Sequence, residues 1–140
     1  MFIQPCFIQK CTPALIEKLV GLGYKIVGKT TLSYGIFCNN GKIKICSTNE
    51  QPSIKDKDFI QCYDNEELFL ALAALSDDTN ENQWFIAQDT MWDENYYGEV
   101  TVYYEKGDWL LWNEYSFMED MPSDFKKTTV EEIIEHFKNR

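Results

Sequence analysis

The chain has 140 residues, a formal net charge of −10, 44% hydrophobic residues and 15% aromatic residues. This length is typical of one domain and is sufficient to bury a hydrophobic core, so we expect a single domain over residues 1–140. The longest apolar run, 68–75, is much shorter than the roughly 20 residues that cross a bilayer. The first residues also lack the basic and apolar regions of a signal peptide, so we expect a cytoplasmic protein without membrane contact.

The charge is distributed unevenly along the sequence. Residues 1–57 carry eight lysines and three acids, whereas residues 58–124 carry seventeen acids and one lysine. The strongly acidic segment 58–124 should repel the phosphates of nucleic acids and attract basic surfaces. We therefore predict a basic protein partner and no direct contact with nucleic acid. The lysines of the first third are scattered in sequence, which favours an ordinary solvated surface for them.

The cysteines do not form a recognisable metal or disulfide pattern. Their number is odd, no pair has CxxC spacing, and the chain has a single histidine, His136. We expect reduced thiols, several of them in the core, and neither a metal nor another cofactor. The five cysteines are Cys6, Cys11, Cys38, Cys46 and Cys62.

The first predicted helix follows Thr12-Pro13, because threonine is a favoured N-cap and proline is favoured at the first helical position. Glycines at 21 and 23 predict its end. Strands are predicted on either side of it, at 2–8 and 24–27. The apolar face of the helix consists of Leu15, Ile16, Leu19 and Leu22.

A β-hairpin is predicted around Asn40-Gly41. Asn-Gly favours a two-residue type I′ turn, in which both central residues have positive φ. The resulting register places four apolar side chains on one face and Phe37, Lys42 and Lys44 on the other. The apolar pairs are Cys38 with Ile43 and Ile36 with Ile45.

The second predicted helix follows Asp64, with Glu67 in capping-box spacing. Its body, LFLALAALS, is apolar nearly all round, which indicates a helix buried on several sides. Strands are predicted before it at 59–62 and after it at 83–87.

A second hairpin is predicted over residues 101–114, with its turn at Lys106-Gly107. This register would give both faces large apolar side chains. One face would pack on the helices, and the other would be covered by further chain or exposed. The predicted pairs are Tyr104 with Trp109, Val102 with Leu111, Tyr103 with Leu110 and Thr101 with Trp112.

The third predicted helix begins at Thr128 or Thr129, each of which has a glutamate three residues later. The apolar stripe of this helix consists of Val130, Ile133, Ile134 and Phe137.

Together the predicted helices and strands indicate an α+β fold with a mainly antiparallel sheet and three helices.

The segment MWDENYYGEVTVYY, residues 91–104, places acids among aromatics. Paired carboxylates beside aromatic rings suit a glycosidase, aromatic anchors suit a protein interface, and an ordinary hairpin core also explains them. We predict a non-enzymatic interaction protein in which aromatics anchor a basic partner and acids steer it. The predicted binding residues are Trp92, Asp93, Glu94, Tyr96, Tyr97, Glu99, Glu119 and Asp120.

Two alternatives remain open at this point. The same segment, with Asp89, could form the pocket of a small enzyme or of a small-ligand or carbohydrate binder. The apolar outer face of the second hairpin could instead pair with itself in a homo-oligomer.

Residues 78–89 partly resemble a calcium-binding loop. Asp78, Asn80, Asn82 and Asp89 fall at positions one, three, five and twelve, but position six is Gln83 instead of glycine. The second half of the segment also has a strand pattern. We expect a solvated turn that leads into a strand.

Two segments, FIQKCTPALIEKLVGLGYK and CYDNEELFLALAALSDDTNENQWF, resemble small uncharacterised proteins of Bacteroides-type gut bacteria and their phages or mobile elements. The resemblance covers about half of the chain and concerns helix caps and core positions. It implies a shared fold and a phage-related genomic setting, in which small proteins often act as inhibitors, adaptors or immunity factors. It implies no particular activity.

Overall fold

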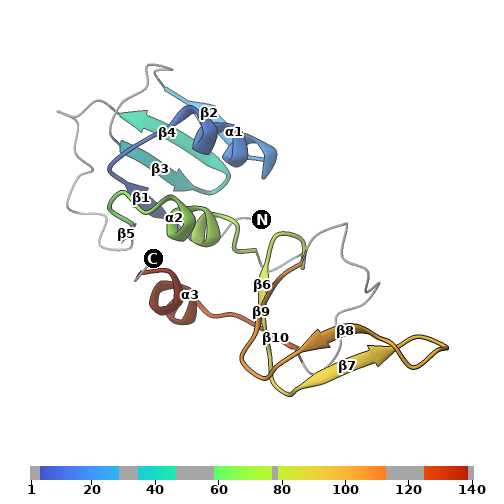
Figure 1. Ribbon diagram of the computed structural model, residues 1–140. Coiled ribbons are helices and arrows are strands. Elements are labelled where there is room, and N and C mark those ends of the chain that lie inside the picture. Colours follow the sequence, from blue (N-terminus) through green and yellow to red (C-terminus); the bar gives the residue numbers. More distant parts are fainter. Residues whose placement is uncertain (1–3, 29–34, 47–58, 77–78, 113–124, 139–140) are drawn as a thin grey trace. The chain divides into compact units, whose positions relative to one another are not determined.

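The computed structural model describes residues 4–28, 35–46, 59–76, 79–112 and 125–138. These residues form three helices and ten strands with mainly antiparallel pairing, which confirms the predicted α+β class (Figure 1). They group into two compact units: unit 1 comprises residues 1–78 and 130–140, and unit 2 comprises residues 79–129. In the described part of the chain, no helix has the length and apolar character needed to cross a bilayer.

Unit 1 contains a five-stranded sheet in the order β2-β4-β3-β1-β5. The three central strands pair antiparallel, whereas the edge strands β2 and β5 join their neighbours in parallel. The strands predicted near both ends of the first helix and before the second are confirmed within the described residues. The strands are β1 (Cys6–Ile8), β2 (Lys25–Val27), β3 (Gly35–Asn39), β4 (Lys42–Cys46) and β5 (Ile60–Gln61).

The β3–β4 hairpin has the predicted register. Asn40 and Gly41 both have positive φ, at 49° and 78°, as a type I′ turn requires. All four of the predicted apolar side chains on one face are buried, whereas Lys42 and Lys44 are exposed. The observed pairs include Cys38 with Ile43 and Ile36 with Ile45.

Helix α1 (Pro13–Gly21) begins as predicted. The hydroxyl oxygen of Thr12 accepts a hydrogen bond from the Leu15 backbone N–H at 3.2 Å, and Pro13 occupies the first turn. Leu15 and Leu19 are buried from its apolar face.

Helix α2 (Glu66–Ala73) begins one residue later than predicted. The N-cap is Asn65 and not Asp64, because Asn65 Oδ1 accepts a hydrogen bond from the Leu68 backbone N–H at 3.0 Å. Asn65 also donates through Nδ2 to the Phe137 carbonyl at 2.9 Å. The same side chain therefore caps α2 and binds the end of the third helix.

Helix α3 (Val130–Phe137) follows Thr129 directly. Of its predicted apolar stripe, Ile133 and Phe137 are buried, and Val130 and Ile134 are partly buried. The other predicted start, Thr128, has a different role: its hydroxyl donates to the Trp84 carbonyl at 3.0 Å.

The core of unit 1 lies between the sheet and helices α1 and α2. Cys6 in β1 has its Sγ 3.9 Å from the Phe69 carbonyl of α2, and the Tyr24 hydroxyl donates to the Ala73 carbonyl. Burial raises the pKa of the Cys6 thiol, and its contacts with the Cys38 and Cys62 thiols raise that pKa further. These thiols therefore act as small apolar groups.

Unit 2 contains a three-stranded sheet with β6 in the centre and a separate two-stranded pair, β7–β8. Its buried cluster is small: Phe85, Ala87 and Phe125, with Tyr104, Leu110 and Trp112 partly buried against it. Strands β7 and β10 had not been predicted. The strands are β6 (Trp84–Ala87), β7 (Met91–Glu94), β8 (Val100–Tyr104), β9 (Trp109–Leu111) and β10 (Phe125–Lys127).

The prediction of a hairpin that turns at Lys106-Gly107 is wrong. Strand β8 pairs with β7, and strand β9 pairs with β6. Gly107 has a φ of 95°, but Lys106 is not among the described non-glycine residues with positive φ, so a type I′ turn does not form. The Asp108 backbone N–H donates instead to the Glu105 carbonyl, within a turn that carries the chain from β8 into β9.

Strands β6, β7, β8 and β9 together form one long hairpin, whose register is kept from β6–β9 into β7–β8 and shifts by one residue at a bulge between Asp93 and Glu94. Extending the β6–β9 pair Ile86↔Trp109 by five residues along each strand gives Met91↔Tyr104, which is the observed β7–β8 pair. Backbone hydrogen bonds between Ala87 and its partners Gly107 and Asp108 continue the ladder into the interruption.

Candidate functional site

The hairpin tip, residues 95–99, has an ordered backbone. Asn95 Oδ1 accepts hydrogen bonds from the backbone N–H groups of Tyr97 and Glu99, at 2.9 and 3.0 Å. The Asn95 backbone N–H donates to the Glu99 carbonyl, and the Gly98 N–H donates to the Asn95 carbonyl. Gly98 has a φ of 79°, a conformation that glycine adopts without steric cost. Local bonds therefore hold the tip without help from a core.

Two tyrosines occupy the outermost positions of this tip. Tyr96 is 96% exposed and Tyr97 is 82% exposed, with ring centroids 5.5 Å apart in an edge-to-face arrangement. Two adjacent aromatic rings left this open contribute almost nothing to the stability of the fold, and they are available for contact with another molecule.

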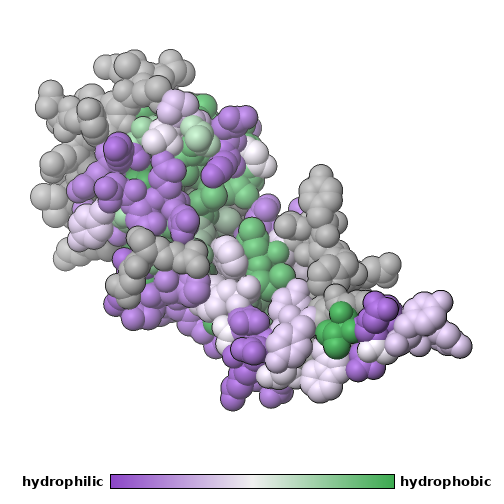
Figure 2. All heavy atoms as spheres, in the orientation of Figure 1, coloured by the Kyte–Doolittle hydropathy of each residue, from purple (hydrophilic) through white to green (hydrophobic). Residues whose placement is uncertain are grey.

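The β7–β8 ribbon (residues 91–104) also has one open face. Trp92 lies opposite Tyr103 in the register, and each is 55% exposed. Glu94 lies opposite Val100 on the same face, beyond a bulge, and both are exposed. In Figure 2 the end of the ribbon shows mainly the pale and purple colours of polar and aromatic side chains.

The base of the opposite face belongs to the core of unit 2. Tyr104 is partly buried, and its ring contacts Phe125 edge to face at 5.2 Å. Burial raises the pKa of Tyr104, with a further contribution from Asp108. The ribbon is therefore anchored at its base through one face, whereas the Trp92–Tyr103 face is exposed.

The predicted acidic residues lie in different places. Glu94 and Glu99 are exposed on the ribbon, and Asp93 lies in β7 between them and Trp92. Glu119 and Asp120 lie outside the described residues. Three further acids of the acidic segment belong to unit 1, at the start of α2: Asp64, Glu66 and Glu67.

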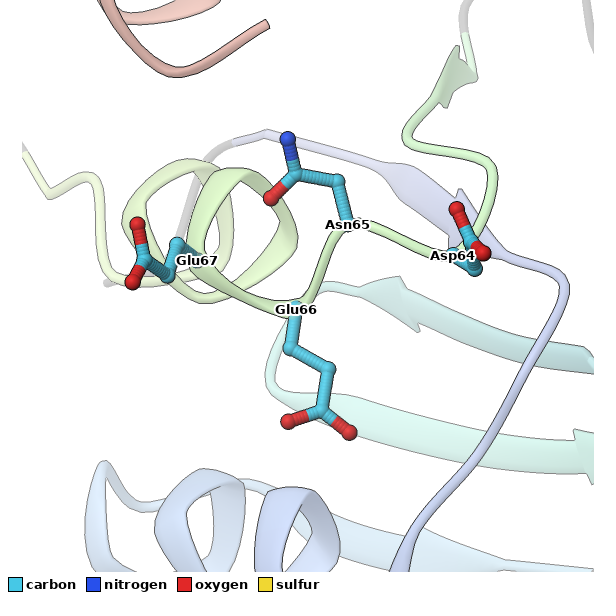
Figure 3. A pocket seen from close by; sticks show the side chains of 4 residues that line it. All are labelled: Asp64, Asn65, Glu66 and Glu67. Atoms are coloured by element: carbon cyan, nitrogen blue, oxygen red, sulfur yellow. The ribbon is translucent and has the colours of Figure 1, made fainter. Parts of the chain in front are cut away.

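These three acids and Asn65 line an open hollow of about 380 Å³ (Figure 3). Two of the four side chains have structural roles: the Thr12 hydroxyl donates to Glu66 Oε1 at 2.6 Å, and Asn65 caps α2. Figure 3 shows Glu66 directed toward α1 and Asn65 toward the end of α3. Acidic groups also stabilise the N-terminal end of a helix dipole. These roles explain the cluster without a ligand.

The thiols lack the features of a nucleophile. Four of the five are buried, and Cys11 is partly exposed. Burial raises the pKa of Cys11 to about 11, with a smaller contribution from the charge of Glu66. Since the thiolate is the reactive form, Cys11 is a poor nucleophile at neutral pH.

The segment with a partial calcium-loop pattern leads into β6 at Trp84, so the predicted strand in its second half is confirmed. Gln83, at the sixth position, is buried, and Asn82 has a φ of 62°. Asp78 lies outside the described residues. Within the described ranges, no group of three or more His, Cys, Asp or Glu side chains is arranged to hold a metal ion.

An ordinary hairpin was one explanation for residues 91–104, but the β7–β8 pairing and its turn were not predicted, although the sequence contained a signal for that turn. Asparagine at the first position of a turn and glycine at the fourth are typical of a type I turn, and Asn95 and Gly98 have that spacing.

Comparison of the chain with protein-family models, curated proteins and solved structures found no match. The resemblance to phage-related proteins therefore stays a prediction from sequence.

Proposed function

We propose that this protein is a non-enzymatic interaction protein that binds a basic protein partner through the β7–β8 ribbon. The observation that supports this most is the pair Tyr96 and Tyr97, exposed on a tip that Asn95 and Gly98 hold in place. Inhibitors, adaptors and immunity proteins, the class predicted from sequence, act through such surfaces.

The aromatic side chains would supply the binding energy. Tyrosine and tryptophan are the residues most enriched at the energetic centres of interfaces, because each buries a large area while ordering few rotatable bonds. Trp92 and Tyr103 continue the aromatic surface from the tip along one face of the ribbon. A preorganised tip also lowers the entropy cost of association.

The charges determine which partner fits. Residues 91–108 contain five acids and one lysine, Lys106. Exposed carboxylates around an aromatic centre favour lysine- or arginine-rich surfaces and raise the rate of encounter with them. A basic protein is therefore the occupant that the ribbon's chemistry favours.

The alternative of an enzyme or small-ligand pocket receives less support from this segment. A pocket encloses most of its ligand's surface, whereas Tyr96, Tyr97 and Glu94 lie on an outward ribbon. A glycosidase additionally needs two carboxyl groups on opposite sides of the bond that it cleaves.

A selection of random peptides displayed on phage tests the proposal, with the whole chain as immobilised target. We expect the selected peptides to be rich in lysine and arginine, and to bind the Y96S/Y97S variant at least tenfold more weakly. Their affinity should fall steeply as the salt concentration rises, since exposed charges are screened.

The matched control is Tyr63→Asn, which removes an exposed tyrosine from unit 1 at a position with positive φ that asparagine tolerates. This variant should bind the peptides like the unchanged protein. Selected peptides without basic residues, or equal binding to Y96S/Y97S, would overturn the proposal.

A further inference from the structure

The five-stranded sheet of unit 1 has a second face, which the helices do not cover in the described part of the chain. Cys6, Ile36 and Ile43 point to the helix side and are fully buried. Side chains alternate along a strand, so the intervening residues point the other way. By the observed register this second face carries Phe7, Lys25, Val27, Gly35, Phe37, Asn39, Lys42, Lys44, Cys46 and Gln61. Phe7, Gly35 and Cys46 are buried and Phe37 is partly buried. The exposed part of the face is formed by Lys25, Val27, Asn39, Lys42, Lys44 and Gln61.

Three lysines gather on this face. Lys25 pairs with Lys42 across the β2–β4 ladder, and Lys44 follows two residues later on the same strand. All three are exposed, and the described residues of the face include no aspartate or glutamate. The lysines of the first third are therefore not all scattered, as the sequence had indicated: the sheet register brings these three together.

Aromatic rings lie beside the lysines. Phe37 is the direct register partner of Lys44, and its ring lies 5.2 Å from that of Phe7 and 5.5 Å from that of Phe59. Phe7 is buried, while Phe37 and Phe59 are partly exposed. A Cβ at Gly35 would lie 3.0 Å from the Phe7 ring, so glycine makes room for this cluster.

We propose that this face binds single-stranded nucleic acid. Lys25, Lys42 and Lys44 would neutralise consecutive phosphates, and the partly exposed rings of Phe37 and Phe59 would stack on bases. Exposed lysines beside partly exposed aromatic rings are the chemistry that single strands require, since every base has a stacking face. Duplexes present no free base faces and would gain only the charge contacts.

The net charge of −10 does not exclude such binding, although it led to the opposite prediction from sequence. Charges are screened beyond about 10 Å at 0.1 M salt, so the groups next to a bound phosphate decide its energy. Three phosphate contacts on a single strand predict a slope of about −2 for log K against log salt concentration. The expected binding is therefore weak to moderate and strongly salt-dependent.

Fluorescence anisotropy of labelled dT15 and rU15 with the whole chain, at 0.1 M salt, tests this proposal. We expect saturable binding that the K42E/K44E variant weakens at least tenfold. The charge-matched control, K18E/K138E, changes two exposed lysines that lie on α1 and just after α3, and should weaken binding less than threefold.

The stacking contribution is tested separately by F37L/F59L, which keeps apolar volume but removes the flat rings. Circular dichroism would establish that this variant is folded. We expect a fivefold or greater loss of affinity for dT15 with an unchanged salt slope. A labelled 15-base-pair duplex should bind at least tenfold more weakly than dT15.

Three results would overturn the proposal: no oligonucleotide binding at 100 µM protein, equal binding by K42E/K44E, or equal affinity for the duplex. If no oligonucleotide binds, light scattering would test for self-association. Self-association that K42E/K44E abolishes would show that the lysines contact an acidic protein surface instead. The Y96S/Y97S variant should bind dT15 like the unchanged protein. A failure of the ribbon proposal can therefore be distinguished from a failure of the nucleic-acid proposal.

Discussion

The two units use aromatic and apolar residues differently. In unit 1, residues such as Phe69 and Ile133 are fully buried. Among the described residues of unit 2, the buried apolar cluster consists of Phe85, Ala87 and Phe125, and much of the aromatic surface stays open on the ribbon. The same residue types thus stabilise the fold in one unit and remain available for contact in the other.

This difference shows what holds each region in shape. Unit 1 depends on burial, which is proportional to the apolar area removed from water. The tip of the ribbon depends on hydrogen bonds from Asn95 and on the positive φ of Gly98. Substitutions of aromatic residues should therefore have large effects on stability in unit 1 and small ones at the tip.

The largest expected effect tests that contrast. Phe69→Ala should lower the free energy of unfolding by about 3–5 kcal/mol, because it leaves a cavity at a fully buried position. Y96S/Y97S should change it by less than about 0.5 kcal/mol, as is usual for exposed sites. Urea unfolding followed by circular dichroism measures both, and similar losses in the two variants would show that the tip tyrosines stabilise the fold.

The next effect concerns the reactivity of thiols. With a pKa of about 11, Cys11 should react with iodoacetamide at pH 8 about 100-fold more slowly than a thiol of pKa 9, because its thiolate is that much rarer. Its rate should rise about tenfold per pH unit up to about pH 10 and level off above pH 11. Mass spectrometry of alkylated peptides gives the rates.

Glu66→Gln provides the control for that measurement. Removing the negative charge should lower the pKa of Cys11 and speed its alkylation, while the buried Cys6 should stay unreactive in the folded protein. A slower reaction of Cys11 in this variant would contradict the smaller contribution of Glu66 to the raised pKa.

A smaller effect distinguishes the two candidate caps of α2. Asn65→Ala should lower the free energy of unfolding by about 1–2 kcal/mol, since it removes the bond to Leu68 and the bond to Phe137. Asp64→Ala should cost less than about 0.5 kcal/mol. Thermal or urea unfolding would reveal the difference, and the reverse order would restore the cap predicted from sequence.

The last expected effect is local to the ribbon. Gly98→Ala places a Cβ at a positive φ, which costs about 1–2 kcal/mol, although nothing lies within 4 Å of that position. We expect hydrogen exchange of the Glu99 amide to speed up at least fivefold, as followed by NMR. Gly21→Ala, within α1 and equally uncrowded, is the control and should not destabilise the protein.

Sequence predicted unit 1 well because its signals are local. Thr12-Pro13 and Asn40-Gly41 each determine the backbone of a few neighbouring residues, and the alternation of apolar residues then gives the register. The shift from Asp64 to Asn65 is of the one-residue kind that adjacent capping residues allow, since both side chains can accept the same type of bond.

Unit 2 was predicted less well because its pairing depends on competition between turns. Lys106-Gly107 and Asn95–Gly98 both separate apolar strands, and only the second closes the hairpin. The gathering of Lys25 with Lys42 could not be predicted from spacing alone, since it depends on a parallel pairing of strands seventeen residues apart in sequence. The roles of the ribbon residues stay predictions.

The shared register of the β6–β9 and β7–β8 pairs limits how the tip can change during evolution or in engineering. A single-residue deletion from β7 before Trp92 would turn that side chain to the opposite face. Removal of two consecutive residues from β7, together with their two partners in β8, would shorten the arm and keep its orientation. Arms of different reach could thus be made in steps of two, each presenting the same tyrosine pair.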